Sequence, residues 1–442
     1  MKKDSIIITS IFIISILLSG CVSDGTEDMD YAIMAEEHLG MLMSEDFGSV
    51  YELFDQAMQD EISITELEEL WADLMGTYGE IDKIEDSKDY EDGEYFSVEI
   101  DCLFTSGSKG TFKLVYDEDG QISGFWFTDK TEYSLPPYAD PDIYTEIEME
   151  VVSGDFTLPA VLALPDGEGP FPCVVLVHGS GPNDMDETIG PNKPFKDIAT
   201  GLASKGVAVL RYDKRTYAYP VRTSMEIYTM TLMEETVFDA LAAVDTIKNL
   251  PGIDPNGIFI AGHSLGGMSA PRIASLSDDL AGIIILAGNA RPVQELVIEQ
   301  FEYLSSYDGV IDEEERAAID DIVEAARKIT ELDIGDSELL IGAPKKYWED
   351  LSTYDQVQVA KGLDIAMLLL QGERDYQVTM ADFDIWSQEL DGMDNTTLVS
   401  YPGLNHLFMF GTSPSIGDEY LIKGIVEEQV TLDIVEWMEG LP

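Results

Sequence analysis

The chain has 442 residues, of which 45% are hydrophobic, so it is long enough for two folded domains with apolar cores. Its 86 acidic and 25 basic residues give a net charge of −61, which repels phosphate backbones and excludes nucleic acid as a partner. The charge also disfavours acidic substrates. We interpret it as a solvated acidic coat suited to salty surroundings rather than as a set of calcium sites.

The first twenty residues are typical of an export signal. Lys2 and Lys3 precede an apolar run from Ile6 to Leu18, which at 13 residues is too short to span a membrane. The following Leu18-Ser19-Gly20-Cys21 resembles the lipobox of prokaryotic lipoproteins. That resemblance implies cleavage before Cys21, its lipidation, and anchoring at the outer face of the cell membrane. A plain secretory signal with an incidental cysteine is the alternative.

Residues 21–30 are small and acidic and are expected to form a tether, after which residues 31–132 predict a small α+β domain. Apolar residues have helical spacing up to about Tyr78, and alternating strands are expected at 95–104, 110–116 and 122–127. The arrangement resembles the small domain of unknown function that precedes hydrolases in prokaryotic lipoproteins. This implies no activity, and we expect a spacer, docking or ligand-gating role.

Residues 133–142, with their proline pair, are the predicted linker to a second domain at 143–442. Two antiparallel strands at 143–152 and 158–164 precede apolar strands that alternate with helices. This pattern predicts a doubly wound, mostly parallel α/β sheet covered on both faces. The expected strands are 174–177, 207–212, 258–261, 283–286, 365–370 and 397–401, and the expected helices are 195–204, 232–249, 267–275, 381–390 and 422–438.

Nearly 80 residues, mostly helical in pattern, separate the strands at 283–286 and 365–370. This interval is too long for one crossover. It predicts a helical cap inserted at about 290–360 over the carboxyl ends of the strands, where open α/β sheets bind their ligands.

A candidate nucleophile lies in Gly262-His263-Ser264-Leu265-Gly266, which reads Gly-x-Ser-x-Gly. The motif stands between an apolar strand and a run of small residues that can open a helix. A sharp turn there exposes the serine hydroxyl, and the glycines are needed where a Cβ would collide with neighbouring backbone. We therefore predict Ser264 as the nucleophile, with an ordinary glycine-rich turn as the alternative.

An attacking serine needs a base and a carboxylate that orients the base. The chain has four histidines, and His406, just past the strand at 397–401, is the candidate downstream of the serine. His263 should point away from the nucleophile, and His178 ends a strand where an oxyanion loop is expected. His38 lies on a helix in the first domain, without a partner at catalytic spacing.

Asp375, which follows the strand at 365–370 and a glycine-containing turn, is the predicted acid. Glu373 is its closest rival, while Asp382 and Asp384 fall in the next helix and are expected to be solvated. The order Ser264, Asp375, His406 is that of α/β-hydrolases.

The tetrahedral oxyanion of acyl transfer needs N–H donors. We predict the amide of Leu265, at a helix N-terminus, and the amide of Ser180, with Gly181 as the alternative to Ser180. No cofactor is expected. No metal is expected either, because no histidine pair has ligand spacing.

The stretch Val174–Arg215, with His178-Gly179-Ser180-Gly181-Pro182-Asn183, resembles the dienelactone-hydrolase and acyl-esterase branch of the α/β-hydrolases. So does Gly372-Glu373-Arg374-Asp375. The resemblance covers about residues 140–442 and implies a carboxylic-ester hydrolase that works through an acyl-enzyme without a cofactor. Dienelactone hydrolases use cysteine as nucleophile, so Ser264 favours ester or thioester cleavage over lactone opening.

Part of the same stretch, Leu210-Arg211-Tyr212-Asp213-Lys214-Arg215, leaves two interpretations open. Its charged residues either contact a substrate carboxylate or hold the loop after the strand. Two other functions also remain: a serine peptidase of the prolyl-oligopeptidase or aminopeptidase kind, and a non-catalytic envelope lipoprotein that binds a ligand.

Overall fold

The computed structural model describes residues 31–92, 95–105, 107–130, 133–307 and 309–441, and the predicted anchor Cys21 lies outside them. Contacts divide the chain into two units, of which the larger comprises Leu135–Glu419 and Gly424–Pro442. In these ranges, no helix has both the length and the apolar character to cross a membrane. Cys102 and Cys173 are buried free thiols.

The smaller unit consists of four helices followed by an antiparallel sheet in the order β1-β2-β3-β4. Ser63 caps the N-terminus of α4, where its side chain forms a reciprocal capping box with Glu66. The sequence analysis missed β1, because its acidic and lysine residues do not alternate with apolar ones; such charges are typical of an edge strand. The elements are α1 (Tyr31–Met43), α2 (Phe47–Leu53), α3 (Gln56–Glu61), α4 (Ile64–Tyr78), β1 (Ile81–Asp92), β2 (Tyr95–Phe104), β3 (Lys109–Tyr116) and β4 (Ile122–Asp129).

The larger unit is built on a mixed eight-stranded sheet in the order β14-β13-β10-β9-β7-β8-β6-β5. The pairs β5–β6 and β6–β8 are antiparallel and all other neighbours are parallel, which confirms the predicted doubly wound α/β fold. The strands are β5 (Tyr144–Ser153), β6 (Phe156–Pro165), β7 (Phe171–Val177), β8 (Ala208–Tyr212), β9 (Ile253–His263), β10 (Gly282–Leu286), β13 (Ala366–Gly372) and β14 (Thr396–Tyr401).

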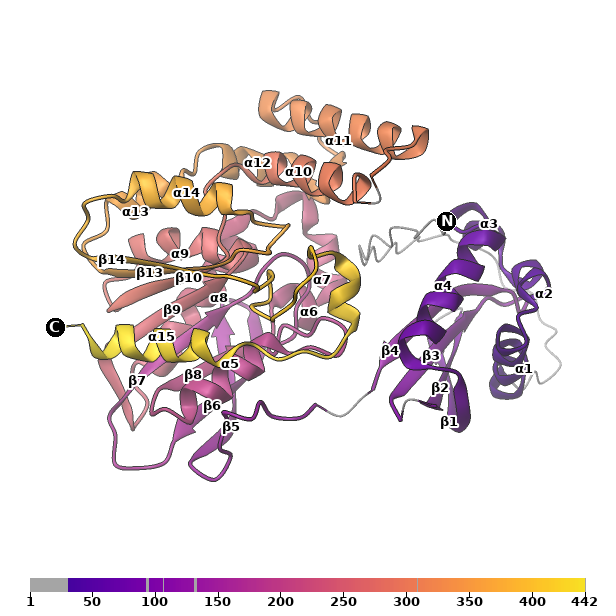
Figure 1. The fold of residues 1–442 in the computed structure, drawn as a ribbon, viewed down its shortest axis with the longest axis horizontal. Helices are drawn as coiled ribbons and strands as arrows, with labels where there is room; N and C mark the ends of the chain where they lie inside the picture. The colour runs from indigo at the N-terminus through magenta and orange to yellow at the C-terminus, as the bar shows by residue number, and fades with distance from the viewer. Residues whose placement is uncertain (1–30, 93–94, 106, 131–132, 308, 442) are drawn as a thin grey trace. The chain divides into compact units, whose positions relative to one another are not determined.

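Helices cover both faces of this sheet (Figure 1). One apolar core joins the sheet to α5 (Pro194–Ala203) and α15 (Glu428–Glu439). The other joins it to α8 (Phe238–Ile247), α9 (Leu265–Ser275) and α14 (Met380–Glu389). The helix expected from residue 422 was wrong at its start, because regular helix begins only at Glu428. The remaining short elements before β9 are α6 (Arg215–Ala218), α7 (Pro220–Met225), η1 (Ile227–Thr229) and η2 (Met233–Val237), and η3 spans Gly417–Leu421.

The interval between β10 and β13 is mostly helical, and α10 reaches the carboxyl end of β13. Gln300 in α10 donates from Nε2 to the carbonyl of Gln377, in the loop after β13, at 2.9 Å. The inserted elements are α10 (Val293–Ser305), α11 (Glu313–Glu331), β11 (Leu339–Leu340), β12 (Ala343–Pro344), α12 (Lys345–Ser352) and α13 (Gln356–Lys361).

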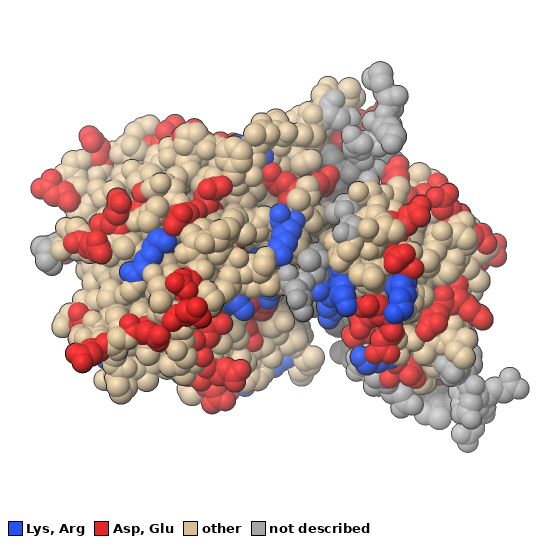
Figure 2. Space-filling view, turned by 60° about the horizontal axis from the view of Figure 1, so that its bottom comes forward, with Lys and Arg blue, Asp and Glu red and all other residues tan. Residues whose placement is uncertain are grey.

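Acidic side chains are scattered over the face of the molecule shown in Figure 2, with few lysines and arginines between them. Some of the cations are inside instead: Arg211, Lys214 and Arg215 are 2%, 2% and 6% exposed. These cations have acidic partners that are buried with them, since Arg211 pairs with Asp186 and Arg215 with Asp239.

Candidate active site

The register of the parallel strands sets where the candidate residues lie. Val177 at the end of β7 is paired with Gly262 of β9, and His263 with Leu286 of β10. Beyond β10, β13 and β14 continue in register to their own ends. Because parallel strands finish at the same edge of a sheet, the loops after β7, β9, β13 and β14 meet there. Those loops carry Ser180, Ser264, Asp375 and His406.

The turn at Ser264 is sharp and left-handed, with φ +54° and ψ −115°. The two glycines of the motif permit it because backbone crowds them on both sides. A Cβ on Gly262 would lie 2.1 Å from the carbonyl oxygen of Gly266, and a Cβ on Gly266 would lie 2.2 Å from that of Val177. Only glycine fits either position, and the serine side chain is left partly exposed.

Asp375 and His406 are joined by a hydrogen bond of 2.7 Å, from Nδ1 of the imidazole to Oδ2 of the carboxylate. Both residues are buried. The other oxygen of Asp375 accepts from the backbone amides of Gln377 and Val378 at 2.8 and 3.0 Å. Gln371, which sequence reasoning missed, donates to Oδ2 at 3.0 Å. The carboxylate is thus fixed, and Nε2 of His406 is left to accept a proton.

The loop that carries His406 packs directly on the end of β13. A Cβ on Gly372 would lie 2.5 Å from the carbonyl oxygen of Leu404, so the close approach requires glycine. Asn405 closes the turn: its side-chain oxygen accepts from the amides of Leu407 and Met409, each at 3.0 Å. This packing brings the loops after β13 and β14 together.

Among residues 133–307 and 309–441, the hydroxyl of Ser264 forms no hydrogen bond, so its contact with His406 is not made in this structure. Such contacts are often long without substrate and tighten when it binds. The rival carboxylates are elsewhere. Glu373 is exposed and accepts from Ser400 at 2.9 Å, and Asp384 is also exposed.

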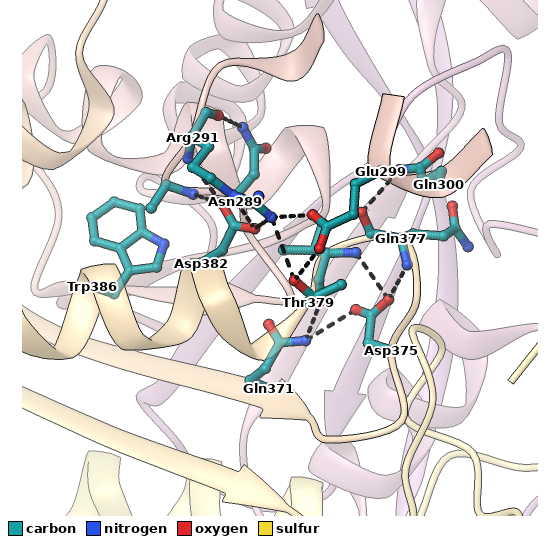
Figure 3. A network of polar contacts seen from close by, with 12 residues as sticks. Asn289, Arg291, Glu299, Gln300, Gln371, Asp375, Gln377, Thr379, Asp382 and Trp386 are labelled. Carbon is teal, nitrogen blue, oxygen red and sulfur yellow. Dashed lines mark hydrogen bonds and ion pairs between the residues drawn. The ribbon is translucent and has the colours of Figure 1, made fainter. Parts of the chain in front are cut away.

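Asp382 was wrongly expected to be solvated, since it is fully buried in the polar network of Figure 3. It accepts from the backbone amides of Ala290 and Arg291, each at 2.9 Å, and from the Arg291 guanidinium at 2.7 Å. The hydrogen bonds from its guanidinium to Asp382 and Glu299 raise the pKa of Arg291. The network ties the start of the insertion to α14, the helix that follows the Asp375 loop.

The loop after β7 lies against the nucleophile, because a Cβ on Gly179 would be 3.2 Å from the Cβ of Ser264. The Gly179 amide is already occupied, since it donates to Oε1 of Glu187 at 2.6 Å. Ser180 is the next residue along this loop, and Asn183 Nδ2 donates to its carbonyl at 3.0 Å. Leu265 is the first residue of α9, so its amide has no acceptor within the helix.

The charged residues at the end of β8 and directly after it hold loops. Lys214 Nζ donates to the carbonyl of Gly179 at 2.9 Å and to Glu235 at 2.6 Å. Arg211 pairs with Asp186 and Glu146, and Asp213 accepts from the amide of Met185. Arg215 pairs with buried Asp239. Of the two interpretations, the structure favours the one in which these residues hold the strand-end loop.

The two histidines outside the candidate triad in this unit are both buried. His178 packs between Phe195 and Tyr212, and burial lowers its pKa to about 4. His263 lies within ion-pair distance of Glu187, with Nδ1 3.0 Å from Oε2. In the smaller unit, Nδ1 of His38 lies 3.1 Å from the hydroxyl of Tyr116, a contact inside the core.

A cavity of about 350 Å³ lies between α9 and the insertion. Met268, which contributes to its wall, is one turn from the candidate nucleophile: its amide donates to the carbonyl of Ser264 at 2.9 Å. The wall also includes the apolar residues Val293, Ile329, Trp348 and Leu351.

Comparison with known proteins gives two family matches. Residues 174–414 match the alpha/beta hydrolase family, and residues 35–125 match a family described as a protein of unknown function (DUF3887). Esterase EstD of Thermotoga maritima is 38% identical over 424 residues, which cover 96% of this chain and 98% of the relative.

Solved structures are more distant. Est1E from Butyrivibrio proteoclasticus is 21% identical with a TM-score of 0.44, covering 66% of this chain and 99% of that one. An acylaminoacyl peptidase of Pyrococcus horikoshii is 15% identical with a TM-score of 0.47, covering 82% of this chain and 56% of that one. Neither likeness is close enough to indicate a substrate.

Proposed function

Because this chain belongs to the α/β hydrolase family, we propose that it is a serine hydrolase that cleaves small carboxylic esters or thioesters through an acyl-enzyme. The observation that carries the proposal is the 2.7 Å hydrogen bond between His406 and Asp375, at the same sheet edge as the strained turn of Ser264. The name of the 38% identical relative, an esterase matched along nearly its whole length, supports ester substrates.

In the proposed reaction, Ser264 Oγ attacks the ester carbonyl while Nε2 of His406 takes the hydroxyl proton. Asp375 accepts from Nδ1–H, which selects the tautomer with a free Nε2 and stabilises the imidazolium. The amides of Leu265 and Ser180 are the proposed donors to the oxyanion. The imidazolium then protonates the departing alcohol or thiol. Water, deprotonated by His406, releases the acid and restores Ser264.

The cavity beside Met268 is one helical turn from Ser264, and the apolar part of its wall suits the hydrocarbon part of such a substrate, while Arg291, Asp355 and Gln356 make the rest polar. The acidic surface favours neutral or cationic esters over anionic ones, because like charges repel an approaching substrate.

The test compares Ser264→Ala with Ser275→Ala, an exposed serine on the same helix. We expect Ser264→Ala to lower kcat on p-nitrophenyl acyl esters by at least about 10⁴-fold and to abolish labelling by a fluorophosphonate, with Ser275→Ala unchanged. Labelling of Ser264→Ala by the fluorophosphonate, or a kcat within about tenfold of the wild type, would refute Ser264 as the nucleophile. Turnover of aminoacyl anilides without ester turnover would show a peptidase instead.

Asp375→Asn tests the acid. The amide can accept from Gln377 and Val378 as the carboxylate does, but it favours the wrong imidazole tautomer, so we expect kcat to fall by about 10⁴-fold. Glu373→Gln, two residues away and exposed, is the matched control and should keep its activity. Equal activities for the two variants would contradict the assignment of Asp375.

We also propose that Cys21 is lipidated and holds the protein at the outer face of the cell membrane, on the strength of the lipobox resemblance. Full-length protein should partition into the detergent phase of a cloud-point extraction, and Cys21→Ser should move it to the aqueous phase. If the full-length protein and Cys21→Ser partition identically, the lipid anchor is refuted and the plain secretory signal is the remaining interpretation.

A further inference from the structure

A buried charge pair that the proposed reaction does not use lies beside the nucleophile. Glu187 and His263 are 2% and 5% exposed, with Oε2 and Nδ1 3.0 Å apart. Burial by itself disfavours both charges. Attraction to the carboxylate nevertheless raises the pKa of His263, and attraction to the imidazolium lowers the pKa of Glu187. Both shifts favour the ionised form of the pair.

Each member of the pair has a second contact, and the two contacts lead to opposite sides of Ser264. Oε1 of Glu187 accepts from the amide of Gly179 at 2.6 Å, in the loop that continues to Ser180. Nε2 of His263 donates to the backbone carbonyl of His406 at 2.9 Å, and the two imidazole rings are 4.6 Å apart between centroids. The loops after β7 and β14 are thus both linked to the residue preceding Ser264.

The backbone at Glu187 is held in an unfavourable conformation. Its φ of +52° lies in the left-handed region, which a residue with a Cβ rarely adopts. Asp184 stabilises the turn, since its carboxylate accepts from the amides of Asp186 and Thr188 at 3.2 and 2.9 Å. A strained turn maintained by a hydrogen-bonded loop aims the carboxylate inward, which is typical of a functional position rather than of a surface loop.

We propose that Glu187 and His263 are positioning residues, which hold the Ser180 amide and the His406 imidazole in place on either side of Ser264. This inference rests on the proposed function. We assign neither residue a catalytic role, because Oε1 of Glu187 and Nε2 of His263 are bonded to loop backbone and their remaining polar atoms face one another. Their effect on rate comes from geometry: displacing a reacting group by about 1 Å costs about 10²-fold, and losing one oxyanion donor costs about 10²- to 10³-fold.

Three variants test the pair. Glu187→Gln keeps an acceptor for the Gly179 amide and removes the charge, so kcat should stay within about fivefold of the wild type. Glu187→Met removes both, and His263→Phe removes the donor to His406; each should lower kcat by about 10²-fold with KM changed less than threefold. Combining Glu187→Met with His263→Phe should lower kcat little further, because the two residues act as one unit.

Asp239→Asn is the matched control, since it weakens another buried ion pair of the same unit, with Arg215. It should lower the melting temperature and leave kcat within twofold. Should Glu187→Met not fold, Glu187→Gln combined with His263→Phe leaves no unpaired buried charge and should still show a kcat at least tenfold below that of Glu187→Gln.

The outcomes separate this inference from the proposed function. Wild-type protein that neither hydrolyses esters nor reacts with a fluorophosphonate would refute the proposed function itself. Active wild type with full kcat in Glu187→Met or His263→Phe would overturn the positioning roles alone. A rise in KM that accounts for the whole loss in kcat/KM would also overturn the positioning roles, because the positions of Ser180 and His406 affect the transition state.

Discussion

Replacing Asp382 by alanine should destabilise the larger unit strongly, although Asp382 takes no part in the proposed reaction. The carboxylate is fully buried and accepts four hydrogen bonds: from the amides of Ala290 and Arg291, and from Nε and Nη2 of the guanidinium. Without it, both amides and Nε of the guanidinium lose their acceptor at the start of the insertion, while Nη2 keeps Glu299 (Figure 3).

The magnitude follows from these contacts. Breaking a buried charge pair by removing one partner costs about 3 to 5 kcal/mol. Here Glu299 still neutralises Arg291, which lowers the cost, while the two unpaired amides raise it. We expect a loss of about 4 kcal/mol. For a unit of about 300 residues, the entropy of unfolding converts this into a melting temperature lower by about 6 °C.

The assay is thermal unfolding followed by circular dichroism or calorimetry, with Asp384→Ala as control. Asp384 lies two residues further along α14 and is exposed, so its removal should change stability by less than about 0.5 kcal/mol. If the two variants unfold within 1 °C of one another, the network does not hold the insertion as argued.

Two further predictions concern the candidate site. Gly262→Ala places a Cβ 2.1 Å from the Gly266 carbonyl oxygen, so the turn must shift. Labelling by a fluorophosphonate should therefore slow by at least about 10²-fold. The control is Gly40→Ala, whose Cβ has no atom within 4 Å and which should leave the labelling rate unchanged. Burial lowers the pKa of His178 from 6.5 to about 4 in the folded protein. The neutral buried ring therefore favours the folded state above about pH 6.5, and this contribution to stability is lost as the pH falls towards 4. Urea titrations should show His178→Gln losing about 2 kcal/mol less than the wild type between pH 7 and pH 5; equal losses would contradict burial of a neutral ring.

The strand pattern of the larger unit could be predicted because its signal is local. Buried parallel strands are short apolar runs, and β7, β8 and β10 lie within about three residues of the ranges expected for them. Strands of the smaller unit were harder to predict where charged residues replace the alternation of apolar and polar residues. β1 is such a strand, and its pairing with β2 is visible only in the three-dimensional structure. The helix predicted from residue 422 begins only at Glu428, because the apolar residues at 422–426 have helical spacing in the sequence but lie in a loop, where Ile422 is exposed and Val426 is buried.

At the candidate site, sequence indicated which residues follow which strands but not what surrounds them. Asp375 was distinguished from its rivals by position in the chain, whereas Gln371 carries no motif and is recognisable only by its 3.0 Å contact with that carboxylate. From its place in a helix, the sequence predicts Asp382 to be a solvated surface acid. Its partner Arg291 is 91 residues away, so local sequence gives no sign of the contact. Burial of a single charge depends on a distant partner that local spacing cannot show.

These buried charged side chains all lie near the carboxyl edge of the sheet, and they all hold loop backbone in place. Apolar packing fixes the strands, but loops at the carboxyl edge must leave the site open and still satisfy their backbone polar groups. Buried titratable side chains do this by accepting from or donating to loop backbone directly, as Lys214, Glu187, His263 and Asp382 do. Replacing both partners of such a pair by apolar residues often leaves stability unchanged. What the pairs contribute here is therefore the position of the loops, which local sequence patterns do not reveal and on which the proposed proton transfer from Ser264 depends.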